Sequence, residues 1–136
     1  MTKPFLTLPR VLAIDAVTCA AMGAALVAAA DLAGALTEMP PPLLYWAGMA
    51  LLPIAGFIAI VAWRAPAHSG AINLIILGNT LWALTSIVLL FSGAISPNPL
   101  GWLFVLGQAA AVVALTLLER GAAPPCRRRL TELKQE

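Results

Sequence analysis

Four long apolar runs, separated by short breaks, constrain the fold of this chain more than any other feature. The runs cover residues 11–36, 43–63, 71–91 and 100–118. Each run is long enough to cross a bilayer as a helix, which takes about 20 mostly apolar residues. Proline and glycine mark the breaks between them, in EMPPP (38–42), RAPAHSG (64–70) and SGAISPNP (92–99). The pattern predicts an all-α membrane protein with four transmembrane helices in an antiparallel bundle, because short connections join antiparallel neighbours.

The amino-acid composition also indicates a membrane protein. Of the 136 residues, 61% are hydrophobic and 10% are charged, and the mean hydropathy is +0.93. Soluble domains average about 45–50% apolar and about 25% charged residues. A soluble domain of this length buries only about two-thirds of its unfolded surface, so it cannot hide this much apolar surface from water. The lipid bilayer is therefore the expected partner of this chain.

Basic residues alternate between the breaks and predict an orientation. They occur in the arm 1–10, in the second break and in the tail 121–136, whereas the first and third breaks contain none. Because Lys and Arg collect on the cytoplasmic side, we expect an N-in/C-in membrane protein. The domains are then a cytoplasmic arm (1–10), one transmembrane domain (11–120) and a basic cytoplasmic tail (121–136).

The basic residues do not indicate a nucleic-acid site. They flank the apolar runs and form no patch with aromatic side chains, although the net charge is +2. The CRRR cluster at 126–129 is suited to anionic lipid headgroups, and membrane orientation explains it equally well.

The first run has an alternative interpretation as a secretory signal. Lys3 and Arg10 would be its basic region, and AAA at 28–30 would be its cleavage site. The run is longer than the 7–15-residue apolar core of a signal peptide, and Asp15 interrupts it. We therefore expect a retained helix.

Two aspartates lie in this first run. At about 1.5 Å of rise per residue, Asp15 and Asp31 would be about 24 Å apart along one helix and could not pair. Asp31 lies near the outer end, where we expect it to be solvated. Asp15 lies deeper, where a carboxyl is costly and often functional. It either pairs with Arg10 or another arginine at the inner rim, or it belongs to a functional site.

Polar residues also interrupt the third and fourth runs. Asn79, Trp82 and Ser86 share one helix face, while Gln108 lies mid-span and Glu119 lies at the inner edge. Polar side chains in lipid are expected to turn inward and bond to neighbouring helices. The candidate ligand site, or interhelical polar site, therefore comprises Asp15, Asn79, Trp82, Ser86, Gln108 and Glu119.

Small residues and one proline predict how the helices pack. Every fourth position of one face is alanine, at Ala16, Ala20, Ala24 and Ala28, with Gly23 nearby. Such a face allows close backbone approach, either within the chain or to another protein. Pro53 predicts a kink in the second span, and Gly56 would leave room for a neighbouring helix.

Catalytic and metal chemistry are not indicated by the sequence. His68 is the single histidine, and Cys19 and Cys126 form no cluster with it. There is no glycine-rich phosphate loop. We expect a protein that is not an enzyme and that has no cofactor, no metal site and no catalytic residues.

Three segments carry a resemblance to known proteins. IDAVTCAAMGAALVAAADLAG (14–34), LGNTLWALTSIVLL (77–90) and GWLFVLGQAAAVVALTLLER (101–120) resemble small uncharacterised four-span inner-membrane proteins of bacteria. That resemblance implies topology and a bacterial setting, without an activity. The chain is also similar in architecture to the small multidrug resistance transporters, which have four spans and an acidic residue in the first. Asp15 would stand where their glutamate acts, but their glycine-rich motif in the third span is not evident.

Two functions follow as hypotheses. In the first, the protein is a non-enzymatic accessory or interaction subunit that packs through its helices against another membrane protein or itself. In the second, it is a small oligomeric transporter or ligand carrier that uses Asp15 and the polar face of Asn79 and Gln108.

Overall fold

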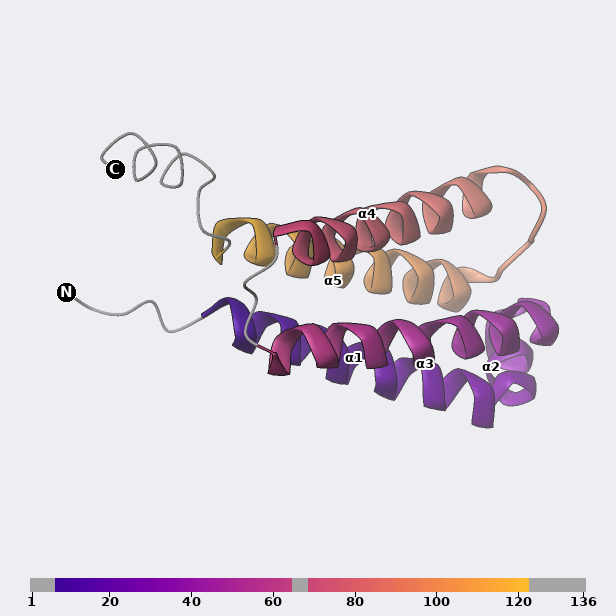
Figure 1. Ribbon diagram of the computed structural model, residues 1–136. Helices are drawn as coiled ribbons and strands as arrows, with labels where there is room; N and C mark the ends of the chain where they lie inside the picture. The colour runs from indigo at the N-terminus through magenta and orange to yellow at the C-terminus, as the bar shows by residue number, and fades with distance from the viewer. Residues whose placement is uncertain (1–6, 65–68, 123–136) are drawn as a thin grey trace, which may run out of the picture.

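Five α-helices make up the part of the chain that the computed structural model describes, residues 7–64 and 69–122 (Figure 1). They are α1 (Leu8–Ala28), α2 (Ala30–Thr37), α3 (Pro41–Trp63), α4 (Ser69–Phe91) and α5 (Pro99–Ala122). Four of them, all except α2, are long and apolar enough to cross a membrane. Lys3, His68, Cys126, the CRRR cluster and residues 123–136 of the predicted basic tail lie outside the described residues.

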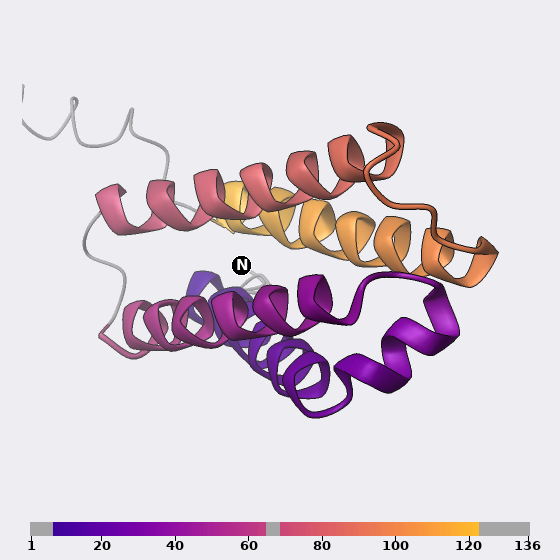
Figure 2. The ribbon, with the colours of Figure 1, turned by 90° about the vertical axis from the view of Figure 1, so that its right-hand side faces the viewer.

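The first predicted span, 11–36, is divided into two helices. Ala29, with φ −129° and ψ 30°, leaves the helical conformation between α1 and α2, and α2 then turns away from the axis of α1 (Figure 2). No proline or glycine marks this break, so hydropathy alone could not reveal it. Asp31 lies exposed in the first turn of α2, where the helix dipole favours an acidic residue.

Contacts made by α2 explain the turn. A Cβ on Gly34 would lie 2.7 Å from Cγ of Pro41, and a Cβ on Gly101 would lie 2.6 Å from the carbonyl oxygen of Thr37. The short helix is therefore packed closely against the starts of α3 and α5. Glu38 ends α2 with a left-handed φ of 55°.

The other spans differ from the predicted ranges mainly at their ends. The prolines of the first break do not all lie outside a helix, since α3 begins at Pro41. A proline is tolerated in the first turn because the N–H it lacks has no partner within the helix there. The helix α3 also continues through Pro53 to Trp63.

The long helices are arranged as two pairs in the views of Figures 1 and 2. The first helix pair is α1 with α3, and the second helix pair is α4 with α5. Within the first pair, a Cβ on Gly48 would lie 2.8 Å from the carbonyl oxygen of Gly23. The backbones of α1 and α3 thus touch at a point where only glycine fits.

The predicted packing residues are distributed unevenly over this interface. Ala16 is buried and Ala20 is half-buried, whereas Ala24 and Ala28 are exposed. No neighbouring atom lies within 4 Å of a Cβ built on Gly56. Within the described residues, Gly23 therefore takes part in the close approach between α1 and α3, and Gly56 does not.

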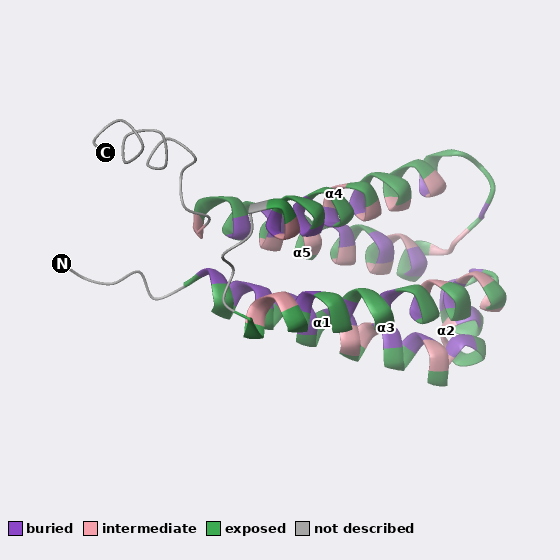
Figure 3. Ribbon diagram, in the orientation of Figure 1, coloured by how far each residue is buried: buried purple, intermediate pink, exposed green. Residues whose placement is uncertain are grey.

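Exposed residues lie along the outside of both helix pairs (Figure 3), and many of them are large and apolar. Val17, Leu103 and Phe91 have exposed fractions of 68%, 69% and 71%. Soluble proteins rarely expose large contiguous apolar patches, whereas lipid solvates such a surface. The helix lengths and this surface together mark a small membrane protein.

Candidate functional site

Three buried polar side chains from three helices meet between the two helix pairs. Asn79 of α4 donates from Nδ2 to Oδ2 of Asp15 on α1 at 2.9 Å, and to Oε2 of Glu119 on α5 at 3.5 Å. The exposed fractions of Asp15, Asn79 and Glu119 are 1%, 6% and 0%. One amide group, which has two N–H donors, therefore joins both carboxyl groups. We call these three residues the acid–amide cluster.

Hydrogen bonding in the cluster is incomplete. Cys19, one turn along α1, donates from Sγ to Oδ1 of Asp15 at 3.6 Å. The second carboxyl oxygen of Glu119, Oε1, is buried and has no hydrogen-bond partner. A buried polar atom without a partner is unusual because water or another group normally satisfies it. The cluster thus keeps unused acceptor capacity inside the molecule.

A second polar network lies within the second helix pair. Trp82 of α4 donates from Nε1 to Oε1 of Gln108 on α5 at 2.9 Å. Gln108 donates from Nε2 to Oγ of Ser86 at 2.9 Å, and Ser86 donates to the carbonyl oxygen of Trp82 at 2.8 Å. We call this closed ring the indole–amide network. It bonds the indole of Trp82 on α4 to the side chain of Gln108 on α5.

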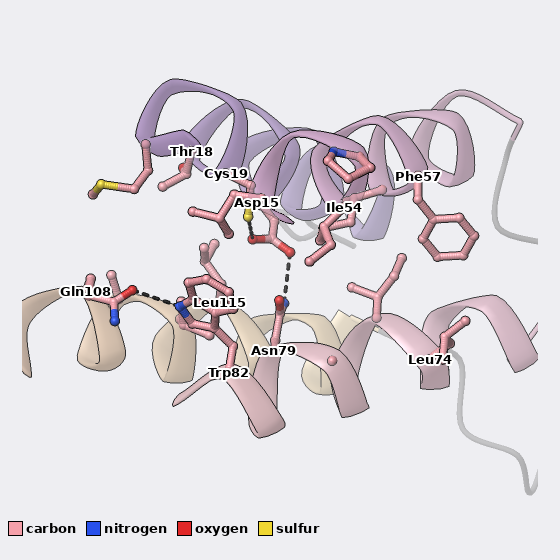
Figure 4. Close-up of a pocket in the computed structure, with 18 residues that line it drawn as sticks. Asp15, Thr18, Cys19, Ile54, Phe57, Leu74, Asn79, Trp82, Gln108 and Leu115 are labelled. Carbon is pink, nitrogen blue, oxygen red and sulfur yellow. Dashed lines mark hydrogen bonds between the residues drawn. The ribbon is translucent and has the colours of Figure 1, made fainter. Parts of the chain in front are cut away.

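Two cavities lie between the helix pairs. The larger, of about 460 Å³, is lined mainly by apolar side chains, with Asp15 and Asn79 at its wall. Figure 4 shows Asp15 and Asn79 bonded across this space, and Trp82 bonded to Gln108 farther along it. The smaller cavity, of about 240 Å³, lies nearer to the start of α3 and is lined in part by Met39, Leu43 and Phe104.

The larger cavity is suited to an apolar ligand with one positive or hydrogen-donating group. Asp15 accepts hydrogen bonds from Asn79 and Cys19, and it lines the wall of this cavity. A carboxyl group accepts on both of its oxygens, which suits a hydrogen-donating group of a ligand. No group of three His, Cys, Asp or Glu residues within residues 7–64 and 69–122 is placed to hold a metal ion.

The six candidate residues from the sequence form two groups in the structure. Asp15, Asn79 and Glu119 belong to the acid–amide cluster, and Trp82, Ser86 and Gln108 form the indole–amide network. The sequence left two interpretations of Asp15 open: an ion pair with an arginine at the inner rim, or a place in a functional site. The structure brings it to the amide of Asn79.

Sequence reasoning missed Cys19, Gly48 and Asn98 as contributors to these contacts. Cys19 follows Asp15 by four residues, a spacing that places both on one helix face. Asn98 accepts from the backbone N–H of Gly101 at 2.9 Å and donates to the carbonyl oxygen of Leu36 at 2.8 Å. An asparagine directly before a proline is a typical start of a helix, so this cap could have been predicted.

Comparison with known proteins adds no relative to this picture. No protein-family model matches the chain, and neither a curated protein nor a solved structure does.

Proposed function

We propose that this protein is a small membrane carrier that binds a lipophilic cation in the larger cavity between its two helix pairs. The observation that carries the proposal is the buried carboxyl group of Asp15 at the wall of an otherwise apolar cavity of about 460 Å³. Ligand pockets of about 300–1,000 Å³ typically combine an apolar lining with a few polar groups that orient the ligand.

The chemistry of the lining defines the ligand class. Leu51, Phe57 and Ile75 offer apolar surface, against which a hydrocarbon or aromatic body gains about 25 cal/mol per Å² of buried area. Asp15 attracts a positive group, and the low dielectric inside the bilayer strengthens this attraction. An ammonium ion with an apolar substituent satisfies both requirements.

The proposed setting is the inner membrane of a bacterium. The four long helices would cross it as an antiparallel bundle with both termini in the cytoplasm. The alternation of basic residues between the breaks supports this orientation.

Reporter fusions test the orientation. A reporter that is active only in the periplasm should be silent when fused after Glu136, and it should be active when inserted at Pro40. An active fusion after Glu136 would overturn the orientation.

Binding in nanodiscs tests the carrier proposal. An n-alkyltrimethylammonium ion should bind the wild-type protein above the background of empty nanodiscs. Asp15→Asn keeps the shape of the side chain and removes its negative charge, so affinity should fall about tenfold or more, corresponding to at least about 1.4 kcal/mol. Equal affinity of the two proteins would contradict the proposal.

Filling the cavity tests the location of the ligand. Gly78 lines the larger cavity, and no atom lies within 4 Å of a Cβ built there. Gly78→Phe should therefore abolish binding without disturbing the fold. Gly107 is equally open but lines neither cavity, so Gly107→Phe is the matched control and should bind like the wild type.

Transport follows as a separate measurement. Proteoliposomes loaded with the unlabelled ion should exchange it for labelled ion outside, and Asp15→Asn should slow that exchange. Binding without exchange would indicate a ligand-binding protein that is not a carrier.

A second candidate function is an accessory subunit of a membrane complex. The exposure of Ala24 and Ala28 on α1 supports it, because small residues on an outer face allow another helix to approach closely. Purification from native membranes in a mild detergent should then recover a partner, and Ala24→Leu should lose it. Recovery of the same partner with Ala24→Leu would contradict this role for the face.

A further inference from the structure

The wall between the two cavities is the feature that extends the proposed function. Four residues line both cavities: Met22, Leu51, Trp82 and Gln108. Met22 and Leu51 come from the first helix pair, and Trp82 and Gln108 come from the second. The two cavities are thus neighbouring compartments that share one wall.

Trp82 is the largest side chain in this wall, and it is held in place. Its indole N–H donates to Gln108 at 2.9 Å, and Gln108 in turn donates to Ser86 at 2.9 Å. The backbone carbonyl of Trp82 closes the ring by accepting from Ser86 at 2.8 Å. Turning the indole out of the wall would break the bond to Gln108, which is costly where no water can replace it.

The position of the acid–amide cluster predicts the orientation of a ligand in the larger cavity. Asp15 and Asn79 lie at its wall, and Trp82 lies one helical turn beyond Asn79 on α4. A ligand whose positive group is bound at Asp15 would extend its apolar body along the cavity towards the indole. The smaller cavity beyond the indole would remain outside its reach.

We propose that Trp82 is a specificity-determining residue that limits the length of the apolar chain in the bound cation. This inference rests on the proposed function, because it assumes a ligand anchored at Asp15. The ligand class is thereby narrowed to amphiphilic ammonium ions whose hydrocarbon chain ends at the indole. Longer chains would have to displace Trp82 from its bond to Gln108.

A homologous series of n-alkyltrimethylammonium ions tests the inference in nanodiscs, with empty nanodiscs as the reference for partition into lipid. In the wild type, affinity relative to the free ion in water should rise about fourfold for each added methylene, the equivalent of about 0.8 kcal/mol. The rise should then stop at a limiting chain length. Trp82→Ala should open the smaller cavity, of about 240 Å³, and move the limit to longer chains.

Two further variants control the experiment. Trp63 is 88% exposed and lines neither cavity, so Trp63→Ala should keep the wild-type limit. Trp82→Leu keeps an apolar side chain in the wall and should raise the limiting chain length by less than Trp82→Ala does. This second variant also carries the test if Trp82→Ala does not fold.

The outcomes separate the two proposals. If the wild type binds no member of the series, the proposed function fails and the length limit fails with it. If the wild type binds but shows no limit, or if the Trp82 variants keep the wild-type limit, the role of Trp82 is overturned and the proposed function stands. The inference is supported if the limiting chain length increases in the Trp82 variants and stays at the wild-type value in Trp63→Ala.

Discussion

The contact within the first helix pair and the contact between the two helix pairs are built in opposite ways. Between α1 and α3, backbone touches backbone, since a Cβ on Gly48 would lie 2.8 Å from the carbonyl oxygen of Gly23 and 2.8 Å from Cβ of Leu26. Between the pairs, hydrogen-bonding side chains bridge a space that contains cavities of about 460 and 240 Å³.

This difference separates a structural contact from a binding region. Close packing between α1 and α3 leaves no space, so even one added methyl group forces the helices apart. Side-chain bridges between the pairs leave room for a ligand, and they can exchange one partner for another. The first contact should therefore be the more sensitive to added volume, and the second to lost polarity.

The largest expected effect follows from adding volume within the first helix pair. Gly48→Leu should destabilise the protein by about 3 kcal/mol, because the new side chain meets the backbone of α1 and cannot be accommodated by a rotamer change. Unfolding in mixed micelles, followed by circular dichroism, measures this loss.

Gly56→Leu is the matched control for that substitution. It lies on the same helix, and no atom is within 4 Å of its Cβ position, so its stability should stay within about 0.5 kcal/mol of the wild type. Similar losses for both variants would mean that the Gly23–Gly48 contact is not the tight point of the pair.

Loss of polarity between the pairs should have a smaller effect. Asn79→Leu removes the donor shared by Asp15 and Glu119, and we expect a loss of about 1–2 kcal/mol without any defect in membrane insertion. Interhelical hydrogen bonds in membranes average about 0.6 kcal/mol and reach about 1.7. Leucine itself favours insertion.

Gln108→Leu sharpens the same comparison. Its hydrogen bonds join α4 to α5 within one helix pair, so we expect a loss of about 0.6 kcal/mol. A crosslinking assay between α1 and α4 should report greater separation of the helix pairs for Asn79→Leu than for Gln108→Leu. The reverse order would contradict the bridging role of the acid–amide cluster.

Asn98 is a further link, located at the start of α5. Asn98→Ala should cost about 1 kcal/mol, because it removes the cap on the N–H of Gly101. It also removes the bond to the carbonyl oxygen of Leu36 near the end of α2. Thermal unfolding in detergent gives the size of the loss.

Asn98→Asp separates the two contributions. It keeps a capping oxygen and removes the donor to Leu36, so it should recover most of the stability that Asn98→Ala loses. If Asn98→Asp is as unstable as Asn98→Ala, the bond to α2 is the larger contribution, and the two pairs are joined more strongly at this end than expected.

The four spans were readable from the sequence because hydropathy is a local property. Runs such as 71–91 exceed the length that crosses a bilayer whatever their neighbours are. The inward-facing polar residues were also predictable as a set, since Asn79, Trp82 and Ser86 fall on one face of any helix that contains them. Helical spacing cannot tell which neighbouring helix that face will meet.

Tertiary structure decided the remaining features. Ala29 breaks the first run because α2 packs against the starts of α3 and α5, and nothing in the alanine-rich sequence marks that position. Gly48, and not Gly56, became the close contact because it faces Gly23 across the first helix pair. Glycines on one helix look alike in sequence, and only the neighbouring backbone distinguishes them.

The acid–amide cluster shows most clearly which features the sequence predicted and which only helix packing decided. Sequence identified Asp15 and Asn79 as costly polar residues in apolar runs, whereas it placed Glu119 at the inner edge, one residue beyond the fourth run. The structure buries Glu119 completely. Only the arrangement of α1, α4 and α5 brought two carboxyl groups to one amide. Such a contact depends on the rotation and depth of three separate helices, quantities that packing determines and that no single segment encodes.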